Sequence, residues 1–191
     1  MSVLRQLYPK VTYVSNITDI DDKIIKASND TGVPISKLTK KFEDIYNKDM
    51  SMLGVKGPDL QPRATEHIED MISLVRRLIE SGNAYVEDGH VLFHVPSYPS
   101  YGMLSKRDVS DQVAGSRVEV ESYKKDAADF VLWKPSTKDQ PGWDSPWGFG
   151  RPGWHLECSV MSEKSLNIPF DLHAGGNDLI FPHHENEIAQ S

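Results

Sequence analysis

Cysteine is almost absent from this sequence, because a single residue, Cys158, stands among 191. One cysteine excludes a disulfide framework within the chain, so the sequence predicts a reducing compartment, the cytoplasm. Long apolar runs are missing too, since no stretch approaches the roughly 20 residues that span a bilayer. The sequence therefore predicts no membrane contact, and its first residues lack the apolar core of a signal peptide.

Positive charge is also scarce. The chain has 21 Lys and Arg residues against 28 Asp and Glu residues, which gives a formal net charge of −7. There is thus no general attraction to a phosphate backbone, and any contact with nucleic acid must be local or lie in another part of a larger protein. A chain of this length buries about 70% of its unfolded surface, enough for one substantial domain or a domain with a small insert.

The N-terminal part predicts a strand followed by helices. Residues 11–14 are β-branched and aromatic, as in a strand. Asp19, Asp21 and Asp22 then place negative charge at the start of a helix, where the helix dipole is positive. A carboxylate metal site is the alternative for these aspartates, but no glycine-containing loop of calcium-binding length accompanies them.

Two amphipathic helices follow, and both apolar faces predict core positions. Thr65 is expected to open the second helix and Gly82 to end it. The first face consists of Leu38, Phe42, Ile45, Tyr46 and Met50, and the second of Ile68, Met71, Ile72, Val75, Leu78 and Ile79.

Residues 83–135 change to a β pattern. Asp88-Gly89 lies between strand-forming residues, which predicts a hairpin. Residues 117–120 alternate like a half-solvated strand, and residues 130–133 are apolar like a buried one. His90 and His94 are four apart on a strand, about 13 Å from each other, too far for one ion.

The last forty residues carry a pattern typical of zinc sites. After a loop rich in proline and glycine, Pro182 is expected to begin a helix in which His183 and Glu187, at i and i+4, share one face. Cys158 would be a third ligand from a separate element. Zinc prefers such nitrogen, sulfur and carboxylate ligands, and the fourth position would be filled from outside the chain or by a substrate.

Taken singly, each of these residues is more often structural: a buried cysteine, a capping histidine, a paired glutamate. Together with Trp154, His155 and His173 they form a denser polar and aromatic collection than a core needs. Gly175-Gly176 allows a ligand to approach the backbone closely, and Asp178 adds a carboxylate suited to ribose hydroxyls or an amine.

Several segments in order resemble the cysteinyl-tRNA synthetases, which are class I aminoacyl-tRNA synthetases: residues 13–23, 62–65, 129–134 and 182–191. The resemblance implies an α/β fold, namely part of a Rossmann-type catalytic domain with a β-rich connective-peptide insert. The first half would span 1–82, the insert 83–135, and the second half with the zinc and cysteine pocket 136–191. It implies ATP, used with Mg²⁺, cysteine and tRNA(Cys) as substrates, and no stable protein partner.

The resemblance also implies roles for single residues. The family's remaining zinc ligand, a cysteine near the N-terminus, has no counterpart here, and neither do its His-Ile-Gly-His and Lys-Met-Ser-Lys-Ser signatures, which bind ATP. No catalytic residue is therefore assigned, and the chain is expected to be an internal part of the catalytic region that is inactive alone. Zinc would be held by Cys158, His183 and Glu187; Thr18, Trp154 and His173 would line the cysteine pocket; and Gly175, Gly176 and Asp178 would meet the ribose or amino group.

Three alternatives stay open at this point. A related ligase of mycothiol biosynthesis joins cysteine to an amino sugar with the same zinc pocket, although residues 187–191 favour the synthetase. A zinc hydrolase would need a general base beside a metal-bound water, for which Glu185 and Glu157 are candidates. The chain could also be a folded module without activity.

Overall fold

The computed structural model describes residues 1–106 and 121–191. The chain forms two compact units. Unit 1 comprises residues 1–67 and 161–170, and unit 2 comprises residues 68–160 and 171–191. The domain boundaries predicted after residues 82 and 135 stay predictions.

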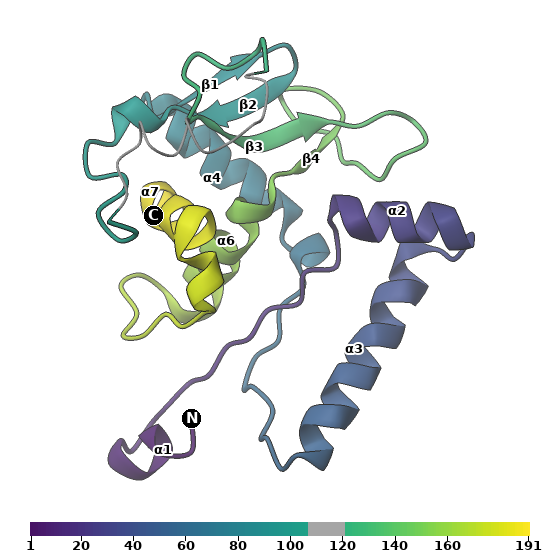
Figure 1. The fold of residues 1–191 in the computed structure, drawn as a ribbon, viewed down its shortest axis with the longest axis vertical. Helices are drawn as coiled ribbons and strands as arrows, with labels where there is room; N and C mark the ends of the chain where they lie inside the picture. Colours follow the sequence, from purple (N-terminus) through teal and green to yellow (C-terminus); the bar gives the residue numbers. More distant parts are fainter. Residues whose placement is uncertain (107–120) are drawn as a thin grey trace. The chain divides into compact units, whose positions relative to one another are not determined.

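Unit 1 consists of helices and extended segments (Figure 1). The second helix, α2, begins as the sequence predicts, because Asp21 accepts a hydrogen bond from the backbone N–H of Ile24 at 2.7 Å. It ends at Thr31 and is followed by Gly32, whose φ of 66° favours glycine. The elements are α1 (Leu4–Leu7), α2 (Asp22–Thr31), α3 (Ile35–Met52) and the 3₁₀ turn η1 (Ala64–Glu66).

The strand predicted over residues 11–14 does not form a regular ladder. Two isolated parallel bridges occur instead, one from Val14 to Leu60 and one from Ile17 to Arg63. The extended segment therefore pairs in the parallel sense that an α/β fold requires, but only at single residues.

Helix α3 confirms the helix predicted over residues 38–50, but the prediction that its apolar face is core is wrong for this chain. Phe42, Ile45 and Tyr46 are 58%, 43% and 48% exposed. Phe42 and Tyr46 line a cavity of about 520 Å³ together with Thr18. The helical period fixes which side chains share a face, and other parts of the fold decide what covers that face.

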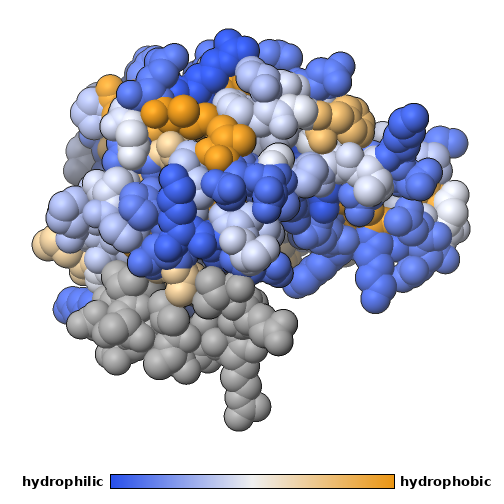
Figure 2. Space-filling view, turned by 90° about the horizontal axis from the view of Figure 1, so that it is seen from above, coloured by the Kyte–Doolittle hydropathy of each residue, from blue (hydrophilic) through white to orange (hydrophobic). Residues whose placement is uncertain are grey.

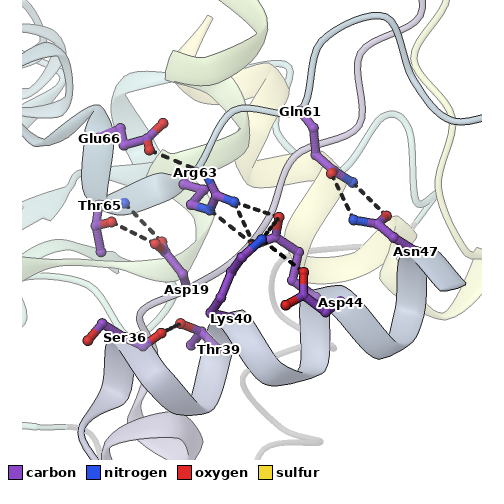
Figure 3. A network of polar contacts seen from close by, with 11 residues as sticks. Asp19, Ser36, Thr39, Lys40, Asp44, Asn47, Gln61, Arg63, Thr65 and Glu66 are labelled. Atoms are coloured by element: carbon purple, nitrogen blue, oxygen red, sulfur yellow. Dashed lines mark hydrogen bonds and ion pairs between the residues drawn. The ribbon is translucent and has the colours of Figure 1, made fainter.

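A polar network joins α3 to the segment around η1 (Figure 3). Arg63 Nη2 donates to both carboxylate oxygens of the buried Glu43, at 2.5 and 2.7 Å, and this contact lowers the pKa of Glu43. Thr65 donates to Asp19 through its backbone N–H at 2.9 Å and its hydroxyl at 2.6 Å. Thr65 thus belongs to η1, and the helix it was expected to open begins at Ile68.

The described part of unit 2 contains an antiparallel sheet in the order β1-β2-β3-β4 (Figure 1). Helix α4 packs against β1 and buries Met71 and Val75 completely, as its apolar pattern predicts. The strands are β1 (Ala84–Glu87), β2 (His90–Phe93), β3 (Phe130–Pro135) and β4 (Gly150–Pro152). The helices and turns are α4 (Ile68–Glu80), η2 (Val95–Ser97), α6 (Trp154–Leu166), η3 (Asn177–Leu179), the π-helical turn η4 (Ile180–His184) and α7 (Glu185–Gln190), and α6 also contributes to unit 1.

The predicted hairpin is confirmed. Asp88 and Gly89 have φ angles of 46° and 74°, as the turn between two paired strands requires, and they join β1 to β2. The buried strand predicted at residues 130–133 is confirmed as part of β3, in which Leu132 and Trp133 are fully buried. The strand predicted at residues 117–120 lies outside the described residues.

The two histidines of the hairpin have structural partners. The His90 ring stacks on Tyr123 with centroids 4.0 Å apart, and His94 Nδ1 lies 3.3 Å from Asp129 Oδ2. Within the described residues, neither histidine belongs to a cluster that could hold a metal ion. That the two histidines do not share one ion stays a prediction from their spacing.

Among residues 1–106 and 121–191, no helix combines the length and the apolar character needed to cross a bilayer. Figure 2 shows one face of the molecule, on which most residues are hydrophilic and the hydrophobic ones form small groups.

Candidate metal centre

Helix α6 positions Trp154, His155 and Cys158. It starts directly after Gly153, where the backbone passes so close to β3 that a Cβ atom would lie 2.1 Å from the carbonyl oxygen of Val131. Only glycine fits there. Because Cys158 follows Trp154 by four residues and His155 by three, its side chain is a neighbour of both on the helix surface. The sequence did not predict this helix, since its apolar residues do not gather on one side.

His183 and Glu187 come from the C-terminal segment. His183 belongs to the π-helical turn η4, and Glu187 lies in the first turn of α7. The prediction that Pro182 begins the helical segment is confirmed, because Phe181 before it is extended (φ −131°, ψ 132°) and the helical backbone from Pro182 to His184 leads directly into α7 at Glu185. The spacing of four brings His183 Nε2 to 3.7 Å from Glu187 Oε1.

The ligand-forming atoms of Cys158, His183 and Glu187 all lie within 4.8 Å of one another. His183 is 4% and Glu187 7% exposed, whereas Cys158 is half-buried. Sulfur, imidazole nitrogen and carboxylate oxygen form a donor set typical of zinc. Oε2 of the buried Glu187 makes no hydrogen bond of good geometry and lies 3.1 Å from Nε2 of the exposed His173, so the carboxylate keeps lone pairs that a bound cation would stabilise. The residues therefore fit a zinc ion.

The imidazoles of this cluster favour the neutral form. Burial lowers the pKa of His183, although the carboxylate of Glu187 partly opposes the effect. Burial also lowers the pKa of His155 to about 4, and the neighbouring His183 shifts it in the same direction. Neutral imidazole keeps the lone pair that binds a metal, so His183 is in its ligand form near pH 7.

Aromatic rings hold His183 in place. Trp154 stacks on it, with ring centroids 4.3 Å apart and planes inclined by 18°. On its Nδ1 side, His183 meets Nδ1 of His155 at 2.9 Å. Phe130 packs edge-on against His155 with centroids 6.0 Å apart. The sequence singled out Trp154 and His155 as part of the collection, but it did not show that both touch a candidate ligand.

A second group of ligand-forming side chains shares Glu187. The relevant atoms of His173, His184 and Glu187 also lie within 4.8 Å of one another. His173 Nε2 forms an ion pair with Glu187 Oε2 at 3.1 Å, and this carboxylate raises the pKa of His173. His173 is exposed, and the group has no sulfur. The group around Cys158 therefore matches zinc better, and His173 borders it through Glu187.

The residues predicted to bind substrate lie in both units of the chain. Trp154 and His173 each touch a candidate ligand, His183 and Glu187 respectively. A Cβ atom on Gly175 would lie 2.3 Å from His184 Nε2, so the loop passes close to that ring. Gly175, Gly176 and Asp178 are exposed in unit 2, and Thr18 belongs to unit 1, where it lines the cavity described above.

Glu185 and Asn186 make contacts that the sequence did not indicate. Both carboxylate oxygens of Glu185 accept backbone hydrogen bonds at 2.8 Å, one from Gly102 and one from Ser105. The hydroxyl of Tyr101 donates to Asn186 Oδ1. Glu185 is 1% exposed, and both of its carboxylate oxygens already accept backbone hydrogen bonds, so it is poorly suited to act as the general base of a hydrolase.

Comparison with known proteins gives the class of this chain. The family model described as "tRNA synthetases class I (C) catalytic domain" matches residues 1–191, and the chain belongs to this family. The match confirms the predicted α/β fold class, to which the helices and the small antiparallel sheet contribute a part.

Individual relatives narrow the class. The chain is 64% identical over 189 residues to the cysteine–tRNA ligase of Parvibaculum lavamentivorans, covering 99% of the chain and 40% of the relative. It is 61% identical over 191 residues to the cysteine–tRNA ligase of Maricaulis maris, covering 99% of the chain and 41% of the relative. It is 56% identical over 190 residues to the cysteine–tRNA ligase of Xanthomonas campestris pv. campestris, covering 100% of the chain and 42% of the relative. The chain thus spans about 40% of the length of these relatives.

Proposed function

We propose that the whole protein is a cysteine–tRNA ligase, which activates cysteine with ATP as cysteinyl adenylate and transfers it to tRNA(Cys). One observation carries the proposal. The cluster of the half-buried Cys158 with the buried His183 and Glu187 suits zinc, and it occurs in a chain that is 64% identical to a protein named cysteine–tRNA ligase. The names of the relatives favour this function over the amino-sugar ligase and the hydrolase.

In this proposal Cys158, His183 and Glu187 hold the metal and leave a position for a further ligand. When bound, zinc supplies a soft Lewis acid that prefers the thiolate of cysteine to the hydroxyl of serine. A site that demands one specific polar partner rejects an analogue lacking it by about 10⁴–10⁵-fold. Such selectivity would make a separate editing site unnecessary.

Other side chains would orient the substrate. Trp154 and His173 border the metal cluster, which supports a role in contacting the cysteine substrate. The exposed segment with Gly175, Gly176 and Asp178 would meet the ribose or the amino group, since it offers a carboxylate beside backbone without side chains. Thr18 is also assigned to the cysteine pocket, on the resemblance to the family alone.

ATP with Mg²⁺ would be the co-substrate of the whole enzyme. The 191-residue sequence contains neither of the family's two ATP-binding signatures. Electrostatic stabilisation of the transferring group is a large part of catalysis, so the chain by itself is expected not to form cysteinyl adenylate. The cytoplasmic location predicted from the cysteine count stays a prediction.

The test is a single substitution in the whole enzyme. Cys158→Ser replaces a thiolate by a hard hydroxyl, and Ser162→Ala, one turn further along α6, is the control. Changes beside a metal ligand typically cost 10–100-fold, so removing a ligand should lower zinc affinity and cysteine-dependent ATP–pyrophosphate exchange by more than about 100-fold. Stoichiometric zinc with unchanged exchange in Cys158→Ser would refute the assignment.

A second assay separates the two ligase functions. The whole enzyme is offered cysteine, ATP and either tRNA or the amino sugar of mycothiol biosynthesis. Transfer of labelled cysteine to tRNA alone is expected. Transfer to the amino sugar alone would overturn the proposal and leave the zinc site unaffected.

A further inference from the structure

The contact between His155 and His183 requires a specific placement of protons. Their Nδ1 atoms lie 2.9 Å apart, which is hydrogen-bond distance. Two neutral imidazoles can make such a bond only if one Nδ1 carries a proton and the other offers its lone pair. The pair therefore has two arrangements, in which either His155 or His183 is the donor.

The two arrangements differ at the other nitrogen of His183. Nε2 of His183 faces Glu187, with Nε2 and Oε1 3.7 Å apart. If His155 donates, the His183 proton is on Nε2 and points toward Glu187. If His183 donates, its proton is on Nδ1 and Nε2 keeps the lone pair that a metal requires.

We infer that His155 is a positioning residue, which accepts a hydrogen bond from Nδ1–H of His183 and thereby fixes the tautomer that presents Nε2 to the metal. The inference rests on the proposed metal site. In this arrangement His155 carries its own proton on Nε2, so both rings are neutral. Metal binding then selects one of the two tautomer arrangements without changing the number of protons on the two rings. Partners of this kind commonly orient histidine ligands.

The surroundings of His155 suit this role. Phe130 packs edge-on against its ring, and Trp154 packs on it with centroids 4.9 Å apart. The side chain of Gln190, at the end of α7, donates to the backbone carbonyl of His155 at 2.9 Å. The acceptor is therefore held by α6, β3 and α7, so it does not need to be ordered when the metal arrives.

The experiment uses the 191-residue chain with Cd²⁺ as a diamagnetic probe that binds thiolates. His155→Asn places an amide oxygen, an acceptor, where Nδ1 stood, whereas His155→Phe keeps a planar ring without an acceptor. His90→Phe, on β2, is the control. Calorimetric titration should show affinity lowered about 10–100-fold in His155→Phe and largely retained in His155→Asn. Long-range ¹H–¹⁵N spectra of the loaded wild-type chain should show His183 protonated at Nδ1.

Several results would overturn the inference. One is an unchanged Cd²⁺ affinity in His155→Phe, and another is an equal loss in both variants, which would indicate packing alone. A loaded chain with the His183 proton on Nε2 would also contradict it. A wild-type chain that binds no Cd²⁺ would instead refute the metal site. In that case the spectra of the metal-free chain still test the hydrogen bond between His155 and His183. The bond requires that one of the two Nδ1 atoms is protonated and that His155→Phe changes the His183 signals, and failure of either condition would show that it does not exist.

Discussion

The carboxylate of Glu185 accepts a hydrogen bond from the backbone N–H of Gly102 at 2.8 Å, across 83 positions of the sequence. Its other oxygen accepts from the N–H of Ser105 at the same distance. Glu185 is buried and opens α7, the helix that carries Glu187. The segment 102–105 therefore anchors the helix of a candidate metal ligand.

Replacing Glu185 by glutamine should destabilise the chain. The amide nitrogen of glutamine cannot accept a hydrogen bond, so one buried backbone N–H would lose its partner, at a cost of about 1–3 kcal/mol. Urea unfolding of Glu185→Gln against wild type measures the loss. The exposed Glu80→Gln is the matched control and should unfold like the wild type. Equal unfolding free energies for both variants would show that the anchor is unimportant.

The ion pair between Arg63 and Glu43 should make stability depend on pH. Arg63 holds the pKa of Glu43 below its usual value, so the contribution to stability is complete above the unfolded pKa of about 4.3 and is lost as pH falls through the folded pKa. The difference in unfolding free energy between wild type and Glu43→Gln should be constant from about pH 5.5 upward and shrink below about pH 4.3. A difference that stays constant down to pH 2 would contradict this account.

The exposed face of α3 gives a prediction about packing. Phe42 is 58% exposed, and its replacement by alanine should change the stability of this chain by no more than about 0.5 kcal/mol. Met71 is fully buried in α4, and its replacement by alanine should lower the free energy of unfolding by about 2–5 kcal/mol. Unfolding curves of both variants make the comparison. A large loss in Phe42→Ala would mean that this face is covered in solution.

The sequence predicted those elements that depend on residues close together in the chain. The hairpin follows from Asp88-Gly89, which adopts the positive φ angles of its turn, and α4 follows from an apolar period that places Met71 and Val75 in the core. The spacing of four brings His183 near Glu187 even though His183 lies in the π-helical turn before α7. The closeness of these two side chains was therefore predictable from their spacing, and their role as metal ligands stays a prediction.

The remaining features depend on contacts between distant parts of the chain. Helix α6 has no apolar stripe, so the periodicity of the sequence could not predict it. Without this helix, the contact between His155 and His183 could not be predicted either. Glu185 looked like a possible general base, because nothing near it in the sequence reveals the two N–H groups that occupy it. Amphipathicity predicted the apolar face of α3, but it could not show that Phe42 would be exposed.

The central claim is that Cys158, His183 and Glu187 bind one zinc ion together. X-ray absorption at the zinc edge, on the 191-residue chain loaded with one equivalent of zinc, tests it most directly. The account predicts one sulfur at about 2.3 Å and the remaining ligands, nitrogen or oxygen, at about 2.0–2.2 Å, with the sulfur lost in Cys158→Ser. A wild-type spectrum with nitrogen and oxygen ligands only would contradict it.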